Sequence, residues 1–267
     1  CALPILVESP EQARVALKAG ANRLYATTDA LAETSWPEDL LAKVTPWLDE
    51  VCREIDHMRL DPYVAAGKPI AVGNISELAL AVERGATPEV RECIPVHNDY
   101  ALQALADMGA EGVWLNSELT LQEICHMARN ASIPVGYMVS GRIRTMTTEH
   151  CILMSTGKCI HDCDACKLRL EEHTLRGIDN DYMPVRTDRH GRSKIWSPKL
   201  FDGVPEIAEM LSAGVKRFMV DATLLSTEQT QEATSRVAAA IAATASGASL
   251  PARLKDASVG HLFSPIG

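Results

Sequence analysis

The sequence of 267 residues predicts an α/β fold, a TIM-like (β/α)8 barrel that is either regular or distorted. Three observations predict this fold. A unit of amphipathic helix, glycine and short apolar strand recurs four times, about eight segments have the character of strands, and the length suits one α/β barrel domain. Repeated alternation of this kind requires right-handed parallel crossovers, with a parallel sheet inside and helices outside.

The four repeated units share one pattern. In each helix Ala, Leu, Val or Ile recur at intervals of three and four residues, and the closing glycine supplies a left-handed C-cap. The units span 10–26, 76–96, 100–115 and 204–221.

The expected strands are short and rich in apolar or β-branched residues. They are Leu3–Val7, Arg23–Ala26, Pro69–Val72, Glu92–Val96, Gly112–Leu115, Pro134–Val139, Met183–Arg186 and Arg217–Asp221. Residues Glu38 to Ile55 are expected to form one longer helix, because Leu41, Val44, Trp47 and Leu48 fall on one helical face.

The alternation stops after Val139 and resumes near Pro205. We therefore expect one barrel domain over residues 1–245 that carries an insertion at about 140–204, and a linker with a terminal segment over 246–267. Because the insertion follows a strand directly, it leaves the barrel at the C-terminal face, where barrel enzymes assemble their active sites.

Composition and charge restrict the class of protein. The net charge of −9 and the pI near 5.4 argue against a broad phosphate-binding surface. No apolar run approaches the roughly 20 residues of a membrane span, and the start at Cys1 lacks the features of a signal peptide. We expect a cytoplasmic piece of a longer chain that does not contact a membrane.

Four of the eight cysteines, Cys151, Cys159, Cys163 and Cys166, lie within sixteen residues, with the spacing C-x7-C-x3-C-x2-C. Four thiolates on one irregular loop can hold zinc or the corners of an iron–sulfur cluster. The alternatives are two disulfides or four unrelated thiols, and His161 offers a substitute ligand. Cysteines in a reducing compartment favour the metal interpretation.

Other polar residues follow the expected strands. Asn98 and Glu118 come after two of them, and Arg142 and Arg144 precede the cysteines with guanidinium groups suited to a carboxylate or phosphate. We take these four as candidate substrate-binding residues. The alternative is helix N-capping for Asn98 and Glu118, and solvated loop charges for the arginines.

Several of these segments resemble peptidase family U-32, the collagenase-like peptidases. The resemblance covers almost the whole chain. It is carried by Glu8–Tyr25, Pro95–Asn98, Ala110–Ile124, Gly141–Arg142, Asp188–Arg192 and Gly260–Phe263.

The resemblance implies a TIM-like barrel and two kinds of activity. One is proteolysis, including collagen degradation, without an established nucleophile. The other is oxygen-independent hydroxylation of RNA bases or ubiquinone precursors, supported by a [4Fe–4S] cluster. Carried onto this sequence, the cluster ligands are Cys151, Cys159, Cys163 and Cys166.

We favour an iron–sulfur protein, either a hydroxylase acting on an RNA base or a small aromatic, or its non-catalytic partner barrel. The partners would be RNA or a small anionic substrate, together with the rest of a longer parent chain or a homologous barrel. A peptidase needs an activated nucleophile or an open metal site, and the sequence contains neither H-E-x-x-H nor G-x-S-x-G. The catalytic residues stay unknown, and the alternatives are a collagenase-like peptidase or a structural zinc barrel.

Overall fold

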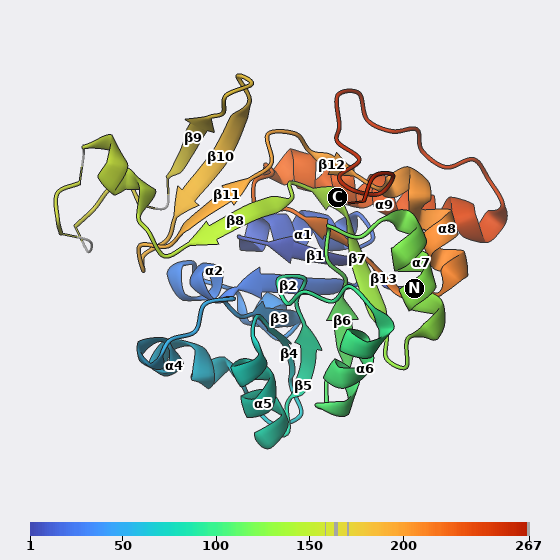
Figure 1. Ribbon diagram of the computed structural model, residues 1–267, viewed down its shortest axis with the longest axis horizontal. Helices are drawn as coiled ribbons and strands as arrows, with labels where there is room; N and C mark the ends of the chain where they lie inside the picture. Colours follow the sequence, from blue (N-terminus) through green and yellow to red (C-terminus); the bar gives the residue numbers. More distant parts are fainter. Residues whose placement is uncertain (158, 163–164, 170, 266–267) are drawn as a thin grey trace. The chain divides into compact units, whose positions relative to one another are not determined.

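A closed barrel of eight parallel strands forms the centre of the protein. The computed structural model describes residues 1–157, 159–162, 165–169 and 171–265. Neighbouring strands pair in the order β7, β13, β1, β2, β3, β4, β5, β6, and the pairing of β6 with β7 closes the ring (Figure 1). The strands are β1 (Pro4–Val7), β2 (Arg23–Thr27), β3 (Val44–Trp47), β4 (Pro69–Val72), β5 (Thr87–Val90), β6 (Gly112–Trp114), β7 (Val135–Gly141) and β13 (Arg217–Asp221). The predicted TIM-like barrel is confirmed.

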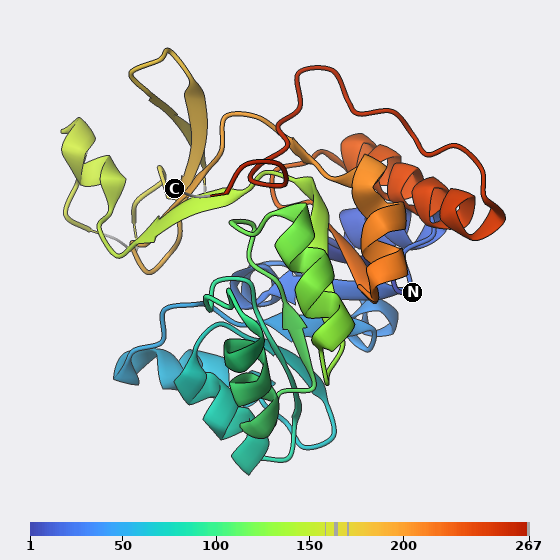
Figure 2. The ribbon, with the colours of Figure 1, turned by 45° about the vertical axis from the view of Figure 1, so that its right-hand side comes forward.

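Helices surround this ring, with α9 packed on α1 and α8 on α7 (Figure 2). They are α1 (Pro10–Lys18), α2 (Thr28–Glu33), α3 (Glu38–Leu41), α4 (His57–Leu60), α5 (Ile75–Glu83), α6 (Asp99–Asp107), α7 (Leu121–Asn130), α8 (Ile207–Ala213) and α9 (Thr227–Ser246). Many of these helices have an N-cap residue whose side chain accepts a hydrogen bond from the backbone N–H three residues later. Ser9, Asn74 and Asn98 are examples. Within the described part of the chain, no helix has the length and hydropathy needed to cross a bilayer.

Three sequence predictions of local structure are wrong. The helix expected from Glu38 to Ile55 is divided: α3 ends at Leu41, and β3 follows as the strand that the sequence count lacked. The strand expected at Glu92–Val96 lies earlier, at Thr87–Val90, because the chain turns directly after β5. Met183–Arg186 does form part of a strand, β10 (Tyr182–Thr187), but that strand belongs to a separate antiparallel sheet.

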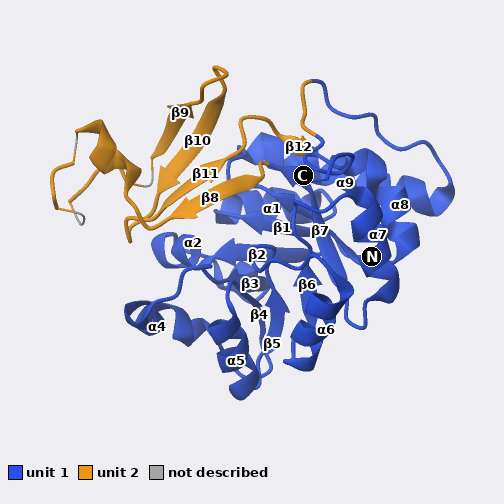
Figure 3. Ribbon diagram, in the orientation of Figure 1, with its two compact units in different colours: residues 1–141, 202–255, 259–267 blue, residues 142–201, 256–258 orange. Residues whose placement is uncertain are grey.

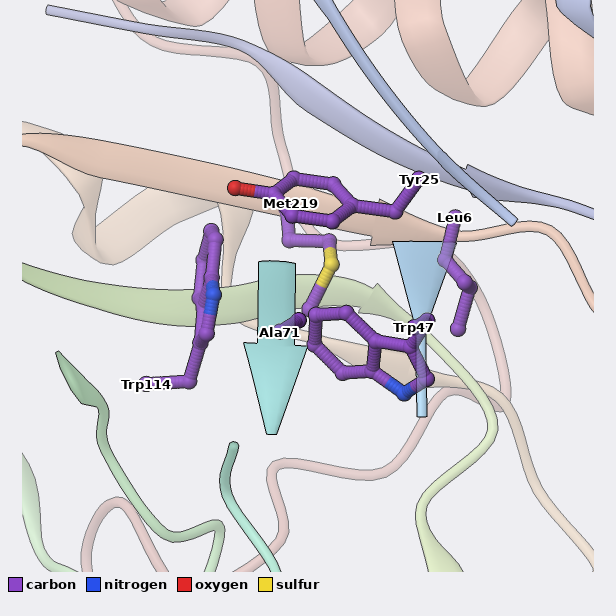
Figure 4. Packing of buried hydrophobic residues seen from close by; sticks show 6 residues of the cluster. All are labelled: Leu6, Tyr25, Trp47, Ala71, Trp114 and Met219. Atoms are coloured by element: carbon purple, nitrogen blue, oxygen red, sulfur yellow. The ribbon is translucent and has the colours of Figure 1, made fainter. Parts of the chain in front are cut away.

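Large side chains fill the barrel interior. Tyr25 packs edge-on against Trp47 and Trp114, with ring centroids 5.2 and 5.8 Å away (Figure 4). The same cluster contains Leu6, Ala71 and Met219, so six residues from six strands meet there. Burying aromatic rings of this size is a dominant apolar contribution to a core.

Two glycines make room for large side chains of the interior. A Cβ added at Gly136 on β7 would lie 2.5 Å from Cζ3 of Trp114 on the neighbouring β6, and one added at Gly112 on β6 would lie 2.6 Å from Nη2 of Arg217, two strands away on β13. Both distances are below any van der Waals contact. A side chain at either position would therefore displace Trp114 or Arg217.

A buried carboxylate links three strands of the ring. Glu89 on β5 is 3% exposed and receives the Tyr25 hydroxyl at 2.5 Å. Its two oxygens also lie 2.8 Å from the guanidinium groups of Arg23 on β2 and Arg217 on β13. Burial, followed by the charge of Glu89, raises the pKa of Tyr25. The hydroxyl therefore stays protonated and donates a hydrogen bond to Glu89.

The chain forms two compact units, shown in different colours in Figure 3. The barrel unit comprises residues 1–141, 202–255 and 259–267, and the second unit comprises 142–201 and 256–258. The second unit contains an antiparallel sheet in the order β8, β11, β10, β9. Its other strands are β8 (Arg144–Thr148), β9 (Glu172–Arg176) and β11 (Ser193–Trp196).

The C-terminal segment is fixed to the barrel unit by a buried aspartate. Asp202, which is fully buried, accepts two hydrogen bonds from Arg236 on α9, at 2.7 and 2.8 Å. It also accepts the N–H of Leu254, at 2.8 Å. Further along, Leu262 is buried and its carbonyl accepts the N–H of Leu121 at the start of α7.

We expect Glu89→Gln to destabilise the barrel by about 3–5 kcal/mol, because it leaves the buried Arg217 and the partly exposed Arg23 without their counter-charge. Chemical denaturation measures this change. Glu111→Gln, an exposed carboxylate next to β6, is the control and should change stability by less than about 0.5 kcal/mol. Equal effects of the two substitutions would mean that the buried pair contributes nothing.

Candidate functional site

A network of charged residues lies just beyond the carboxyl ends of β3 to β5. Arg91, the first residue after β5, is 1% exposed and stands over the Trp47 ring at 4.8 Å. Its guanidinium donates to the Leu48 carbonyl and pairs with Glu50 and Glu92 at 3.5 and 3.3 Å. Burial alone would lower the pKa of Arg91, but the neighbouring Cys93 and carboxylates outweigh burial, so the group stays charged.

A second guanidinium lies at the same end of the barrel. Arg59 on α4 contacts Asp49 at 3.0 Å, Asp29 at 3.2 Å and Asp56 at 3.5 Å. Three carboxylates, one on α2 and two in the segment after β3, therefore converge on one cation. This arrangement ties α2 to the segment after β3, and among the donors of Arg59 only Nε has no hydrogen-bond partner within the described residues.

Glu77 is a buried carboxyl of this network whose pKa is strongly shifted. It lies on α5 with 2% exposure, and its Oε2 accepts the Gly73 N–H at 3.0 Å. Burial raises its pKa to about 7, although the Gly73 hydrogen bond and the charge of Arg91 oppose the shift. The carboxyl thus changes its charge near neutral pH, as general acids and bases in enzymes do.

Two thiols lie near this carboxyl. Cys93 donates to the Gly73 carbonyl at 3.3 Å, and Cys52 is close enough to Glu77 for the two groups to affect each other's pKa. Burial, followed by the charge of Glu77, raises the pKa of Cys52 to about 11, so its thiol stays protonated. Cys93 is half-buried, whereas Cys125 on α7 is buried.

Two of the predicted substrate-binding residues lie on one side of the barrel. Asn98 caps α6 by accepting the Ala101 N–H at 2.9 Å, which is the capping alternative recognised in the sequence. It also lines a cavity of about 410 Å³ together with His97. Glu118 is half-exposed and lies 3.6 Å from Nε2 of His97. The helix after Glu118 is capped by Thr120 instead.

The other two predicted residues belong to the second unit. Arg142 donates to the Ser197 carbonyl at 2.8 Å, and Arg144 opens β8, where it is paired with Trp196 of β11. The sheet thus fixes the backbone of Arg144, whereas Arg142 is held through its side chain.

The thiol segment begins after β8 with Cys151. A short 3-10 helix, η3 (Ile152–Thr156), follows, and the Ile152 N–H donates to Oγ of Ser193 on β11 at 3.0 Å. Leu153 is buried, so this turn is packed on the second unit. Gly157 ends it in the left-handed conformation at φ 69°.

Three of the four predicted ligands lie within the described residues, and Cys163 lies outside them. Cys151, Cys159 and Cys166 are half-buried thiols without a disulfide bond. The His161 N–H donates to Sγ of Cys159 at 3.4 Å, an interaction that favours a thiolate. The donor set suits zinc or an iron–sulfur cluster, although no group of three potential ligands within 4.8 Å among the described residues contains a cysteine.

Sequence reasoning missed the charged network for identifiable reasons. The sequence predicts a strand at Glu92–Val96, directly after Arg91, and a helix over Glu38–Ile55, which contains Asp49, so it places neither residue at the end of a strand. Glu77 did carry a signal, because Asn74 and Glu77 have the spacing of a capping box. Its burial could not be read from that spacing.

We expect Glu77→Gln to gain stability relative to the wild type as the pH rises from about 5 to 8. The folded pKa exceeds the unfolded one, so deprotonation penalises the folded wild type over this interval, by up to about 3 kcal/mol. Denaturation curves at several pH values measure the difference. Glu83→Gln on the exposed side of α5 is the control, and parallel curves for wild type and Glu77→Gln would contradict the assignment.

Comparison with known proteins agrees with the fold. A cube-shaped, highly porous protein cage designed by fusing symmetric oligomeric domains is 11% identical with a TM-score of 0.53, over 92% of this chain and 74% of that one. A structure described as native KDPGal is 11% identical with a TM-score of 0.52, over 91% of this chain and 96% of that one. At this identity the likeness shows the fold alone. No curated protein matches the sequence.

The family assignment comes from the sequence itself. The family model of peptidase family U32 matches residues 79–259. The match includes β5 to β7, the thiol segment, the antiparallel sheet and the return to the barrel at β13. The chain therefore belongs to peptidase family U32.

Proposed function

We propose that this chain binds a [4Fe–4S] cluster through Cys151, Cys159, Cys163 and Cys166. We propose further that it supports oxygen-independent hydroxylation of an RNA base or a small aromatic compound, or serves as the non-catalytic partner barrel of such an enzyme. The observation that carries the proposal is the set of four cysteines within sixteen residues of one segment. The half-buried, unbridged state of the three described thiols supports it.

The surroundings of the segment are consistent with a ligand loop. Its first turn is held by Ser193 and the buried Leu153, while Cys159 accepts a backbone N–H. Hydrogen bonds to cysteine sulfur are one of the means by which proteins set the potential of a cluster. When bound, a cluster supplies one-electron transfer, and the protein contributes binding and orientation.

Arg142 and Arg144 are proposed to hold an anionic group of the substrate. Guanidinium groups bind carboxylate or phosphate through two parallel hydrogen bonds. Arg142 directs one Nη toward Ser197 and keeps further donors for a ligand.

The peptidase alternative would need a nucleophile beside a base. In the barrel unit His97 pairs with Glu118 and His126 with Asp99, which gives imidazole–carboxylate pairs without identifying the attacking group. Cleavage of gelatin that is abolished by His97→Ala would favour this alternative. Stoichiometric zinc without redox behaviour would favour the structural zinc barrel.

We expect the chain to bind about four iron and four sulfide ions after anaerobic reconstitution. Substituting serine for Cys151, Cys159, Cys163 or Cys166 should remove most of the iron and the visible absorbance of the cluster. Iron and sulfide analysis, with electron paramagnetic resonance of the reduced protein, measures this result.

Cys1→Ser is the matched control, because Cys1 is exposed and distant in sequence from the segment. It should leave the iron content unchanged. Full iron binding by all four segment variants, or none by the wild type handled without oxygen, would refute the proposal.

We expect the double substitution Arg142→Gln and Arg144→Gln to weaken binding of an anionic aromatic ligand at least about tenfold, since charge-assisted hydrogen bonds contribute about 1.5–3 kcal/mol each. Isothermal titration calorimetry with benzoate as the probe measures this loss. Arg176→Gln, whose side chain bonds to Asn180 in the β9–β10 hairpin, is the control. Unchanged affinity in the double variant would rule out this role.

A further inference from the structure

The antiparallel sheet of the second unit ends in an open strand. β9 lies at one end of the order β8, β11, β10, β9 (Figure 3). Among the described residues, β10 is the only strand that pairs with it. An edge strand presents N–H and C=O groups to which another extended chain can bind.

Three residues of β9 direct their backbone polar groups to the open side. In an antiparallel ladder, the N–H and C=O of successive residues point alternately to the two sides of a strand. Gly177, directly after β9, points to the β10 side, because its N–H donates to the Asp181 carbonyl at 2.8 Å. Counting back from Gly177, the residues that point outward are Arg176, Thr174 and Glu172. Pro184 of β10, which has no N–H, lies opposite Thr174, in agreement with this assignment.

The side chains of the same three residues are exposed on one face of the sheet. Oε2 of Glu172 lies 3.5 Å from Arg186, and Nε of Arg176 donates to Asn180 at 2.7 Å. Oε1 of Glu172 and the Nη groups of Arg176 have no bond to any other described residue. The exposed face of β9 thus carries a carboxylate at its start, the hydroxyl of Thr174 in its middle and a guanidinium at its end.

This order of side chains is complementary to itself. When a second copy of β9 lies antiparallel to the first with Thr174 opposite Thr174, each Glu172 faces Arg176 of the other copy. The outward N–H and C=O groups of both copies meet in the same register, so the backbone hydrogen bonds and both ion pairs form together. Registers that place Glu172 opposite Glu172, or Arg176 opposite Arg176, bring like charges together and are disfavoured.

We infer that β9 is the interface of a homodimer, in which two copies of this chain join their antiparallel sheets edge to edge. The two-fold axis passes between the two Thr174 residues, as in an isologous contact. A second copy is the occupant, because β9 itself supplies the opposite charges in the required order. Interfaces smaller than about 1,200 Å² are weak or transient, so this contact between short strands should dissociate in the micromolar range.

Sedimentation of the full chain over a range of micromolar concentrations tests the inference, with a reducing agent that prevents disulfide cross-links. The wild type should form a dimer that dissociates on dilution. Glu172→Arg and Arg176→Glu should each weaken self-association at least about tenfold, because each places like charges opposite one another. Glu11→Arg, the same change of charge at an exposed position of α1, is the control and should leave the dimer intact.

A mixture of Glu172→Arg and Arg176→Glu distinguishes this register from a general effect of charge. In the mixture, two arginines on one strand face two glutamates on the other, so a mixed dimer should form although neither variant associates alone. Thr174→Pro removes the central outward N–H, at an edge where proline is tolerated, and should weaken the dimer at least about tenfold. Thr174→Val keeps this N–H and should retain the dimer.

A wild type that stays monomeric would assign the open edge to another partner and overturn the inference. A dimer retained in both charge variants, or no association in their mixture, would overturn it as well. Circular dichroism checks the fold of each variant, and if Thr174→Pro fails to fold, the charge variants and their mixture decide. None of these measurements requires iron, so their failure is distinguishable from failure of the cluster proposal.

Discussion

The barrel depends on a charge held inside a ring of apolar side chains. Glu89 on β5 accepts a hydrogen bond from the Tyr25 hydroxyl and pairs with two guanidinium groups. These partners come from β2 and β13. A carboxylate this deeply buried is tolerable only when its charge is balanced and its oxygens are bonded. The strands that supply these groups must therefore close into one register, which also brings the aromatic rings of the interior together.

The same principle recurs at the carboxyl ends of the strands. Arg91 and Arg59 are surrounded by carboxylates of the protein, and this leaves Glu77 as a group whose charge is sensitive to its surroundings. Buried ion pairs of this kind fix loop positions more than they add stability. The geometry at this end of the barrel is thus set before any ligand arrives, as preorganised sites require.

The sequence was sufficient to predict the barrel, because the helix–glycine–strand unit recurs and each repeat has the correct period. It failed where periodicity is ambiguous. One helical face is matched by Leu41, Val44, Trp47 and Leu48. Pro46 argues against a helix at this place, because proline lacks the N–H that a helix interior needs. A strand of four residues such as β3 has too few positions for its alternating pattern to be clearer than a helical pattern that arises by chance.

The site was predictable only in part, for a different reason. Cysteine spacing is local and can be read directly, whereas the burial of Glu77, Glu89 and Arg91 results from contacts between distant parts of the chain. The capping role of Asn98 follows from local rules and is one of the alternatives that the sequence offers, and Asn74 caps α5 in the same way.

The chain re-enters the barrel unit at Asp202, which is held there by hydrogen bonds, and this has a consequence for the evolution of the fold. Residues on both sides of the inserted unit are held on the barrel: the Gly203 N–H donates to the Val139 carbonyl at 2.8 Å, and Asp202 is fixed by Arg236. Since the exit and the re-entry are hydrogen-bonded neighbours, the entropy of closing the excursion grows only slowly with its length. Such a barrel tolerates extension, shortening or replacement of the segment between these two points, so that one scaffold can acquire new chemistry by exchanging a single module.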